Sequence, residues 1–121
     1  MKGRPAAPVA AQHKLPPSTV TCGTNTYSDT QIQAAIKKGH AHINMPIGDG
    51  NYPHDFKNGE GLPMGPGCAK RPYYEFPILT HGVYDGKDPE TDRVIFKPNG
   101  HYCALITHTD AATRNGFVSC T

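Results

Sequence analysis

The stretch RVIFKPNGHYCALIT, residues 93–107, decides the fold. Two runs of β-branched, aliphatic and aromatic residues flank the dipeptide Asn99-Gly100. Asn-Gly favours a tight turn between antiparallel strands, because both residues tolerate a positive φ angle. The stretch therefore predicts a β-hairpin with strands at Arg93–Phe96 and Tyr102–Thr107.

Two further short runs extend this sheet on either side in the sequence. YYEFPIL (Tyr73–Leu79) and GFVSC (Gly116–Cys120) have the same aromatic and β-branched character, and clusters of Gly, Pro, Asn and Asp separate the runs. The 13 glycines and 12 prolines of the 121-residue chain fit a protein in which turns and loops are frequent. The second half of the chain thus predicts several antiparallel strands.

One helix precedes these strands. Ser28 with Gln31 forms a capping-box pattern at its start, and Gly39 is a candidate for its end. Its apolar stripe consists of Ile32, Ala35, Ile36, His40 and Ile43. A helix followed by antiparallel strands predicts an α+β fold, with one α-helix packed on a twisted antiparallel β-sheet. Residues 1–20 mix Pro, Ala and basic residues without a period and predict a flexible N-terminal extension, which leaves one domain at 21–121.

Composition limits the cellular compartment and the class of binding partner that we expect. Four cysteines in a short, loop-rich chain predict two disulfides and a secreted protein, although spacing alone leaves three possible pairings. Residues 1–18 lack the apolar core of a secretion signal, so we expect the signal to have been removed or replaced. The sequence contains no run of 18 apolar residues, so it predicts no membrane span. A net charge of +2 is too small for a typical duplex-binding protein.

Several polar residues at strand edges could carry chemistry. Glu75 lies inside an apolar run, where burial is costly unless the carboxylate is paired, so it is a candidate acid or base or, alternatively, a solvated strand position. Taken singly, Arg93, His54 and His108 are more typical of structural or solvent-facing positions. Together with a nearby tyrosine they match what phosphodiester cleavage needs: a base, an acid, and cations that stabilise the phosphoryl oxygens.

A metal site is not expected. His40 and His42 form the only candidate pair that the sequence suggests, and no cysteine or carboxylate cluster supports them. The sequence therefore predicts neither a metal nor another cofactor.

Six sequence words occur in order: TCGTNTYS, NYPHDFKNGEG, PYYEFPIL, DRVIF, ITHTDAA and NGFVSCT. In these words the chain resembles the small fungal guanyl-specific ribonucleases of the ribonuclease T-one type, which are distant relatives of the α-sarcin ribotoxins. The likeness runs from about Thr21 to Thr121 and implies the microbial ribonuclease fold.

The resemblance implies a complete catalytic set. It assigns a phosphate contact to Tyr52, support of the base to His54, the general base to Glu75, phosphate binding to Arg93, the general acid to His108, and a wall of the phosphate site to Phe117. The implied reaction cuts single-stranded RNA 3′ of guanosine through a 2′,3′-cyclic phosphate, without a metal. DNA should be inert because it lacks the 2′-hydroxyl. We expect a monomer that does not bind membranes.

The segment that would bind guanine departs from the family. Phe56-Lys57-Asn58-Gly59-Glu60 stands where the family reads Tyr-Asn-Asn-Tyr-Glu. The resemblance implies that Glu60 accepts the guanine N1–H and N2–H₂ groups and that the Asn58 backbone and Asn115 contact the base. Gly59 replaces the tyrosine that covers the base, and such stacking is worth about 1–3 kcal/mol, so we expect weaker guanine binding and looser selectivity. Phe56 is expected to supply one aromatic face and Lys57 a phosphate contact.

The resemblance also implies how the four cysteines pair. Cys22 and Cys120 match the family bridge that joins the two ends of the domain. Cys68 and Cys103 match the second bridge of sarcin-like and related members rather than the short N-terminal bridge of the ribonuclease T-one type.

Two other functions remain as alternatives. A ribotoxin-like protein would act on ribosomal RNA through long basic loops, but here only Leu62–Pro72 separates the base-binding segment from the Glu75 strand. That stretch carries Lys70 and Arg71, which alternatively belong to a solvated turn. A secreted effector that binds RNA or a host target without cutting would be expected to lose catalytic residues, and this sequence keeps them all.

Overall fold

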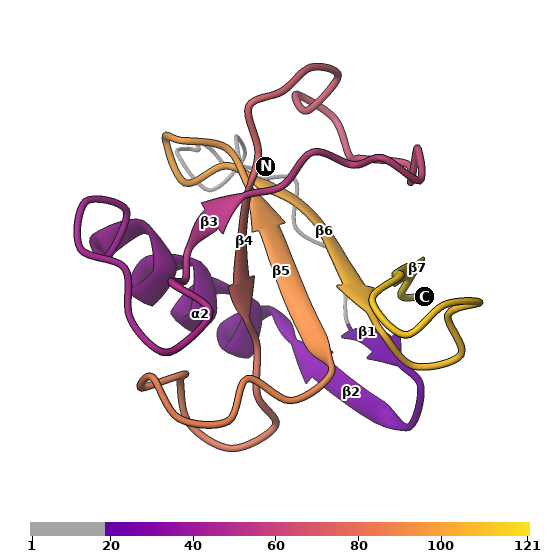
Figure 1. Ribbon diagram of the computed structural model, residues 1–121, viewed down its shortest axis with the longest axis horizontal. Coiled ribbons are helices and arrows are strands. Elements are labelled where there is room, and N and C mark those ends of the chain that lie inside the picture. Colours follow the sequence, from indigo (N-terminus) through magenta and orange to yellow (C-terminus); the bar gives the residue numbers. More distant parts are fainter. Residues whose placement is uncertain (1–18) are drawn as a thin grey trace, which may run out of the picture.

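The computed structural model describes residues 19–121, which form one helix, a five-stranded antiparallel sheet and a separate two-stranded hairpin (Figure 1). In chain order the elements are β1 (Thr19–Cys22), β2 (Asn25–Ser28), α2 (Asp29–Ala41), β3 (His54–Asp55), β4 (Tyr74–Pro77), β5 (Asp92–Phe96), β6 (Tyr102–Thr107) and β7 (Val118–Ser119). The strand order in the large sheet is β3-β4-β5-β6-β7. The predicted α+β architecture is confirmed.

The hairpin predicted at Asn99-Gly100 joins β5 to β6. Gly100 has a φ of 89°, and the Lys97 and His101 backbones close the turn through an N–H···O bond of 2.9 Å. The strands predicted at Tyr73–Leu79 and Gly116–Cys120 are shorter than expected, because β4 ends at Pro77 and β7 covers two residues.

The N-terminal hairpin was not predicted. β1 pairs with β2 in a register that sets Thr19 opposite Ser28, and the turn between them uses Gly23 at a φ of 62°. Thr19 and Val20, which the sequence placed in the extension, belong to β1. The rest of the predicted extension, residues 1–18, lies outside the described residues.

The helix begins with the predicted capping box. Ser28 Oγ accepts the Gln31 backbone N–H at 3.3 Å, and Gln31 Oε1 accepts the Ser28 backbone N–H at 2.9 Å. The candidate end at Gly39 was wrong, since α2 continues to Ala41. A Cβ at Gly39 would lie 2.9 Å from the ring of Phe76, so the glycine allows the helix to lie close to the sheet.

The large sheet separates two hydrophobic clusters. The helix side consists of Ile32, Ala35 and Ile36 packed with Phe76, Val94, Phe96 and Leu105, while exposed His40 does not belong to it. The other face carries Phe56, Tyr73, Ile95 and Ile106 around the Cys68–Cys103 disulfide. Because side chains alternate along a strand, Glu75 and Arg93 lie on this second face, in register with Ile95 and Ile106. We call it the open face.

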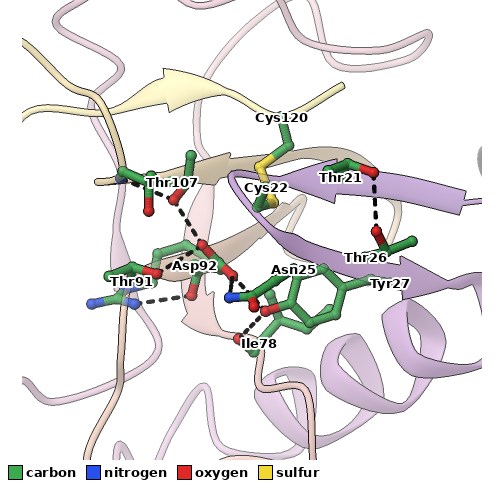
Figure 2. Close-up of a disulfide and its surroundings, with 12 residues drawn as sticks. Thr21, Cys22, Asn25, Thr26, Tyr27, Ile78, Thr91, Asp92, Thr107 and Cys120 are labelled. Carbon is green, nitrogen blue, oxygen red and sulfur yellow. Dashed lines mark hydrogen bonds between the residues drawn. A yellow bond between two sulfur atoms is a disulfide. The ribbon is translucent and has the colours of Figure 1, made fainter.

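A buried carboxylate ties the N-terminal hairpin to the large sheet (Figure 2). Asp92 is 1% exposed and accepts hydrogen bonds from the Tyr27 hydroxyl, from Asn25 Nδ2 at 3.0 Å, from Thr107 Oγ1 at 2.7 Å and from Thr91 Oγ1 at 3.0 Å. Burial and, secondarily, the Asp92 carboxylate raise the pKa of Tyr27. These bonds fix the start of β5 and the end of β6.

The second predicted disulfide, Cys22–Cys120, lies beside this network and joins β1 to the C-terminal segment (Figure 2). Both predicted pairings are therefore confirmed. Within residues 19–121 no helix has the length and apolar character that crossing a membrane requires.

Candidate active site

Glu75 is the centre of the polar cluster on the open face. The residue is only 6% exposed, and two cationic side chains contact its carboxylate. His54 Nε2 lies 2.9 Å from Oε1, and Arg93 Nε lies 3.3 Å from Oε2. The pairing of β3 with β4 sets His54 directly opposite Glu75. The burial of this carboxylate is thus compensated from both sides, as a base that must stay ionised requires.

His54 is held at both ring nitrogens. Nδ1 lies 2.9 Å from the carbonyl oxygen of Gly50, which can only accept, and the ring stacks on Tyr52 with centroids 4.8 Å apart. The hydrogen bond to Glu75 raises the pKa of His54, against an opposing contribution from burial. An acceptor at each nitrogen favours the imidazolium form, which adds a positive charge beside Glu75.

Arg93 is fixed more tightly than any other cation of the open face. Its Nη1 donates to three backbone carbonyls, those of Pro89 at 3.0 Å, Glu90 at 2.9 Å and Asp92 at 2.9 Å. Its Nη2 donates to the Tyr52 hydroxyl at 3.2 Å, and its Cζ lies 5.2 Å from the centroid of the Tyr52 ring. A guanidinium held in this way is a preorganised positive charge, suited to an anionic group that docks on the open face.

His108 lies directly after β6. Its Nδ1 donates to the Gly116 carbonyl at 2.7 Å, and its ring stacks on Phe117 with centroids 4.0 Å apart. Its backbone N–H donates to the Thr91 carbonyl at 2.9 Å. The bond at Nδ1 leaves Nε2 as the nitrogen that can exchange a proton with a bound molecule. Strand alternation carried one residue past Thr107 assigns His108 to the side of Ile106, which is the open face.

The loop after β3 approaches Phe117. Glu60 Oε2 accepts the Phe117 backbone N–H at 2.7 Å, so its carboxylate lies next to the residue whose ring supports His108. Asn58 has a φ of 56°, and its side chain both donates to the Leu62 carbonyl at 2.9 Å and accepts the Leu62 N–H at 2.8 Å. The Asn58 side chain therefore shapes the loop, and the Asn58 carbonyl accepts the Gly61 N–H at 3.0 Å in the same turn.

The remaining residues predicted to bind guanine differ in accessibility. Phe56 is 6% exposed and meets Phe117 edge to face with ring centroids 5.9 Å apart, so its ring supports the wall of the site. Lys57, Gly59 and Asn115 are exposed. A Cβ at Gly59 would meet nothing within 4 Å, which leaves open space where a base-covering side chain would stand.

The predicted site residues thus form two contact groups. Tyr52, His54, Glu75 and Arg93 contact one another directly, and Glu60, Phe56 and His108 meet at Phe117. Lys57 and Asn115 join neither group by a direct contact. Histidines 40 and 42 bond to the carbonyls of Pro98 and Met45. In the described part of the chain no group of three or more metal-ligating side chains is close enough to hold an ion.

Two residues that support the site were not predicted from the sequence. The Gly116 carbonyl orients His108, and Asp92 holds the β5 and β6 ends that carry Arg93 and His108. Backbone carbonyls have no sequence signal. Asp92 did have one: it begins the strand DRVIF and shares the face of Val94 and Phe96, where an unpaired carboxylate would be costly.

Comparison with known proteins agrees with this geometry. A family model described as ribonuclease matches residues 15–121. The chain is 40% identical over 104 residues to guanyl-specific ribonuclease T1 of Aspergillus oryzae, a match that spans 84% of this chain and 77% of that protein. It is 41% identical over 101 residues to guanyl-specific ribonuclease Pc of Penicillium chrysogenum, across 83% of this chain and 95% of the relative.

A solved structure supports the same assignment. The ribonuclease RNase He1 from Hericium erinaceus superposes with a TM-score of 0.63 at 31% identity, and the match covers 86% of this chain and 99% of that one. The fold, the two contact groups and these likenesses converge, and the chain belongs to the ribonuclease family that includes the fungal guanyl-specific ribonucleases.

Proposed function

We propose that this protein is a secreted, monomeric endoribonuclease that cleaves single-stranded RNA 3′ of guanosine. The observation that carries the proposal is the buried Glu75 carboxylate, held between His54 at 2.9 Å and Arg93 at 3.3 Å on the face that also supports His108. Transfer of a phosphoryl group to a neighbouring hydroxyl requires a base and an acid, with fixed cations beside them. Two disulfides and a relative named extracellular, from Gibberella baccata, support secretion.

The first step is a transphosphorylation. Glu75 removes the proton of the guanosine 2′-hydroxyl, and the 2′-oxygen forms a bond to phosphorus as the bond from phosphorus to the 5′-oxygen breaks. His108 donates its Nε2 proton to that leaving oxygen. The products are a 2′,3′-cyclic phosphate and a free 5′-hydroxyl end. DNA is inert in this scheme because it lacks the nucleophile.

The second step is hydrolysis with the roles exchanged. His108, now neutral, takes a proton from a water molecule as the water oxygen forms a bond to phosphorus. The bond from phosphorus to the 2′-oxygen breaks, protonated Glu75 gives its proton to that oxygen, and the product is a 3′-phosphate. In both steps Arg93, Tyr52 and the His54 imidazolium stabilise the charge on the phosphoryl oxygens, and Phe117 keeps the His108 ring in place. The protein's own cations supply this stabilisation, so we expect activity in the presence of EDTA.

Digestion of RNA substrates of defined sequence tests the proposal. We expect RNA with a single guanosine to be cut after that base in EDTA, and mass analysis to detect the cyclic phosphate before the 3′-phosphate. The four homopolymers measure base preference in the same assay. Cleavage that needs a divalent cation, or that yields no cyclic product, would contradict the mechanism.

Ribosomes separate this function from the ribosome-directed alternative. The resemblance to guanyl-specific ribonucleases and the short loop at 62–72 favour a general enzyme. Incubation with intact ribosomes should therefore give many RNA fragments. One discrete fragment from the large-subunit RNA would favour the ribotoxin-like function.

Replacing Gly59 with tyrosine should strengthen cleavage at guanosine sites. The site has open space for the new side chain, and its backbone is not in the left-handed region, so the substitution should fold without strain. Base stacking is worth about 1–3 kcal/mol, so we expect kcat/KM for guanosine sites to rise by roughly 5- to 100-fold, which initial rates on an RNA with a single guanosine measure. Gly59→Ala is the matched control, because it adds a Cβ without a ring. Equal kcat/KM in the tyrosine and alanine variants would show that Gly59 does not lie over the base.

His54 should make stability depend on pH. Because the folded pKa is raised above its ordinary value of 6.5, protonation of His54 stabilises the native state fully below pH 6.5, and this contribution is lost as the pH rises through the folded pKa. We expect the difference in free energy of unfolding between the wild type and His54→Gln to shrink as the pH rises from about 6 to 9. Urea titrations across this range measure it, with exposed His81→Gln as the control. A difference independent of pH would mean that the His54–Glu75 contact does not hold the proton.

A further inference from the structure

Four cationic side chains mark one end of the large sheet. Lys57, Lys70 and Arg71 belong to the loop between β3 and β4, and Lys97 starts the turn between β5 and β6; Figure 1 shows this loop and this turn at the same end. The Lys97 ammonium donates to the Lys70 carbonyl. We call these four residues the basic patch.

Two contacts attach the patch to the active site. Arg71 forms an exposed ion pair with Asp55 at 3.1 Å, and Asp55 is the residue after His54 on β3. Lys97 Nζ lies 5.2 Å from the centroid of the Tyr73 ring, and Tyr73 stands two residues before Glu75. At about 3.3 Å per strand residue, the backbone of Tyr73 lies roughly 7 Å from that of Glu75, so the ring that Lys97 contacts belongs to the same strand region as the proposed base.

The patch is a local feature and not a consequence of overall charge. Residues 19–121 contain ten acidic and nine basic side chains, so the domain as a whole is not basic. The opposite end of the sheet, where the loop between β4 and β5 lies, carries Asp85, Asp88 and Glu90 against Lys87 alone. A polyanion that occupies the open face is therefore attracted towards one end and repelled from the other.

We propose that the basic patch binds the phosphates of the RNA chain beyond the cleaved linkage. The inference rests on the proposed ribonuclease function, since it supplies the partner. Contacts to phosphates carry no sequence information, so the patch contributes to affinity for any single strand and not to base choice. It gives Lys70 and Arg71 a role that a solvated turn would not have.

The test compares a minimal and an extended substrate. The dinucleotide GpU has no phosphate outside the cleaved linkage, whereas a long oligouridine with one central guanosine has many. For Lys70→Gln/Lys97→Gln we expect unchanged kcat/KM on GpU, and on the oligonucleotide roughly a tenfold loss at low salt with a salt slope lower by about 0.7 for each lost contact. Lys37→Gln/Lys38→Gln, the same charge change on α2, is the matched control and should behave as wild type.

Other results overturn the proposal in distinguishable ways. Equal loss on GpU and on the oligonucleotide would mean that the lysines act on the catalytic step. No loss on the oligonucleotide would remove RNA as the partner of the patch and leave an acidic protein or an anionic membrane surface. If wild-type protein cleaves neither substrate, the proposed function fails and not the patch.

A variant of opposite sign strengthens the test. Asp55→Asn removes the counter-charge of Arg71 without touching the lysines. We expect it to raise kcat/KM on the oligonucleotide several-fold at low salt, to leave GpU unchanged, and to steepen the salt dependence. A fall on the oligonucleotide, or no change, would contradict an electrostatic role of the patch.

Discussion

Glu75→Gln should lower kcat/KM for RNA cleavage by about 10²–10⁴-fold, because a glutamine cannot accept the proton of the 2′-hydroxyl. The substitution keeps the side-chain shape and removes one charge from a cluster that retains other bonds. Arg93 keeps its three carbonyl acceptors and the Tyr52 hydroxyl, and His54 keeps the Gly50 carbonyl. We therefore expect the variant to fold, with the loss visible in initial rates on a single-guanosine RNA.

His108→Gln should produce a loss of the same order, since the leaving oxygen then has no group that can give it a proton. The glutamine could still reach towards the Gly116 carbonyl, so Phe117 and its loop should stay in place. The matched controls are Glu90→Gln and His81→Gln, the same chemical changes at exposed positions. Full activity in either purified site variant, with folding verified by circular dichroism, would remove that residue from the mechanism.

Strong local signals made much of the fold predictable. Asn99-Gly100 fixed the central hairpin, and Ser28 with Gln31 fixed the start of α2, because each pattern satisfies backbone hydrogen bonds within a few residues. Gly39 shows the limit of such reasoning. The intrinsic preference of glycine favours a helix end, yet α2 continues beyond Gly39 to Ala41. At Gly39 the helix packs closely against Phe76, which lies 37 residues later in the sequence.

The missed N-terminal hairpin shows a second limit. β1 and β2 are four residues each and largely polar, so alternation in the sequence is weak. What holds them is distant: the Cys22–Cys120 disulfide and the bonds of Asn25 and Tyr27 to Asp92. Such an element becomes predictable only when the residues that anchor it are known.

For the site, residue types gave the chemistry and the fold gave the distances. Glu75 was suspect because a carboxylate in an apolar strand needs partners, and the structure supplies both partners from other strands. The burial of Phe56 and the use of the Asn58 side chain within its own loop could not be foreseen, because both depend on how the loop folds back onto Tyr73 and Leu62. Guanine recognition is therefore the least predictable part of the site.

Cys22→Ala/Cys120→Ala should lower the free energy of unfolding by about 4–5 kcal/mol, since the bridge closes a loop with a sequence separation of 98 residues. In a small domain with a total of about 5–15 kcal/mol this is a large share. Cys68→Ala/Cys103→Ala, which opens a loop of separation 35, is the matched comparison and should cost about 1 kcal/mol less. Urea unfolding of the three proteins measures both values.

The folded fraction of the Cys22→Ala/Cys120→Ala variant should keep its kcat. The Thr121 N–H can still donate to the Thr21 carbonyl, at 2.8 Å in the wild type, and the backbone N–H of the alanine that replaces Cys120 can still donate to the Leu105 carbonyl, at 3.1 Å in the wild type. Asp92 continues to bind Asn25 and Tyr27. Because these bonds hold the ends of β5 and β6, removal of the bridge should lower the free energy of unfolding mainly by raising the entropy of the unfolded chain. The geometry of the site should stay the same. A variant that lost kcat in step with stability, or that was no less stable than the Cys68→Ala/Cys103→Ala protein, would show that the bridge acts by shaping the native state.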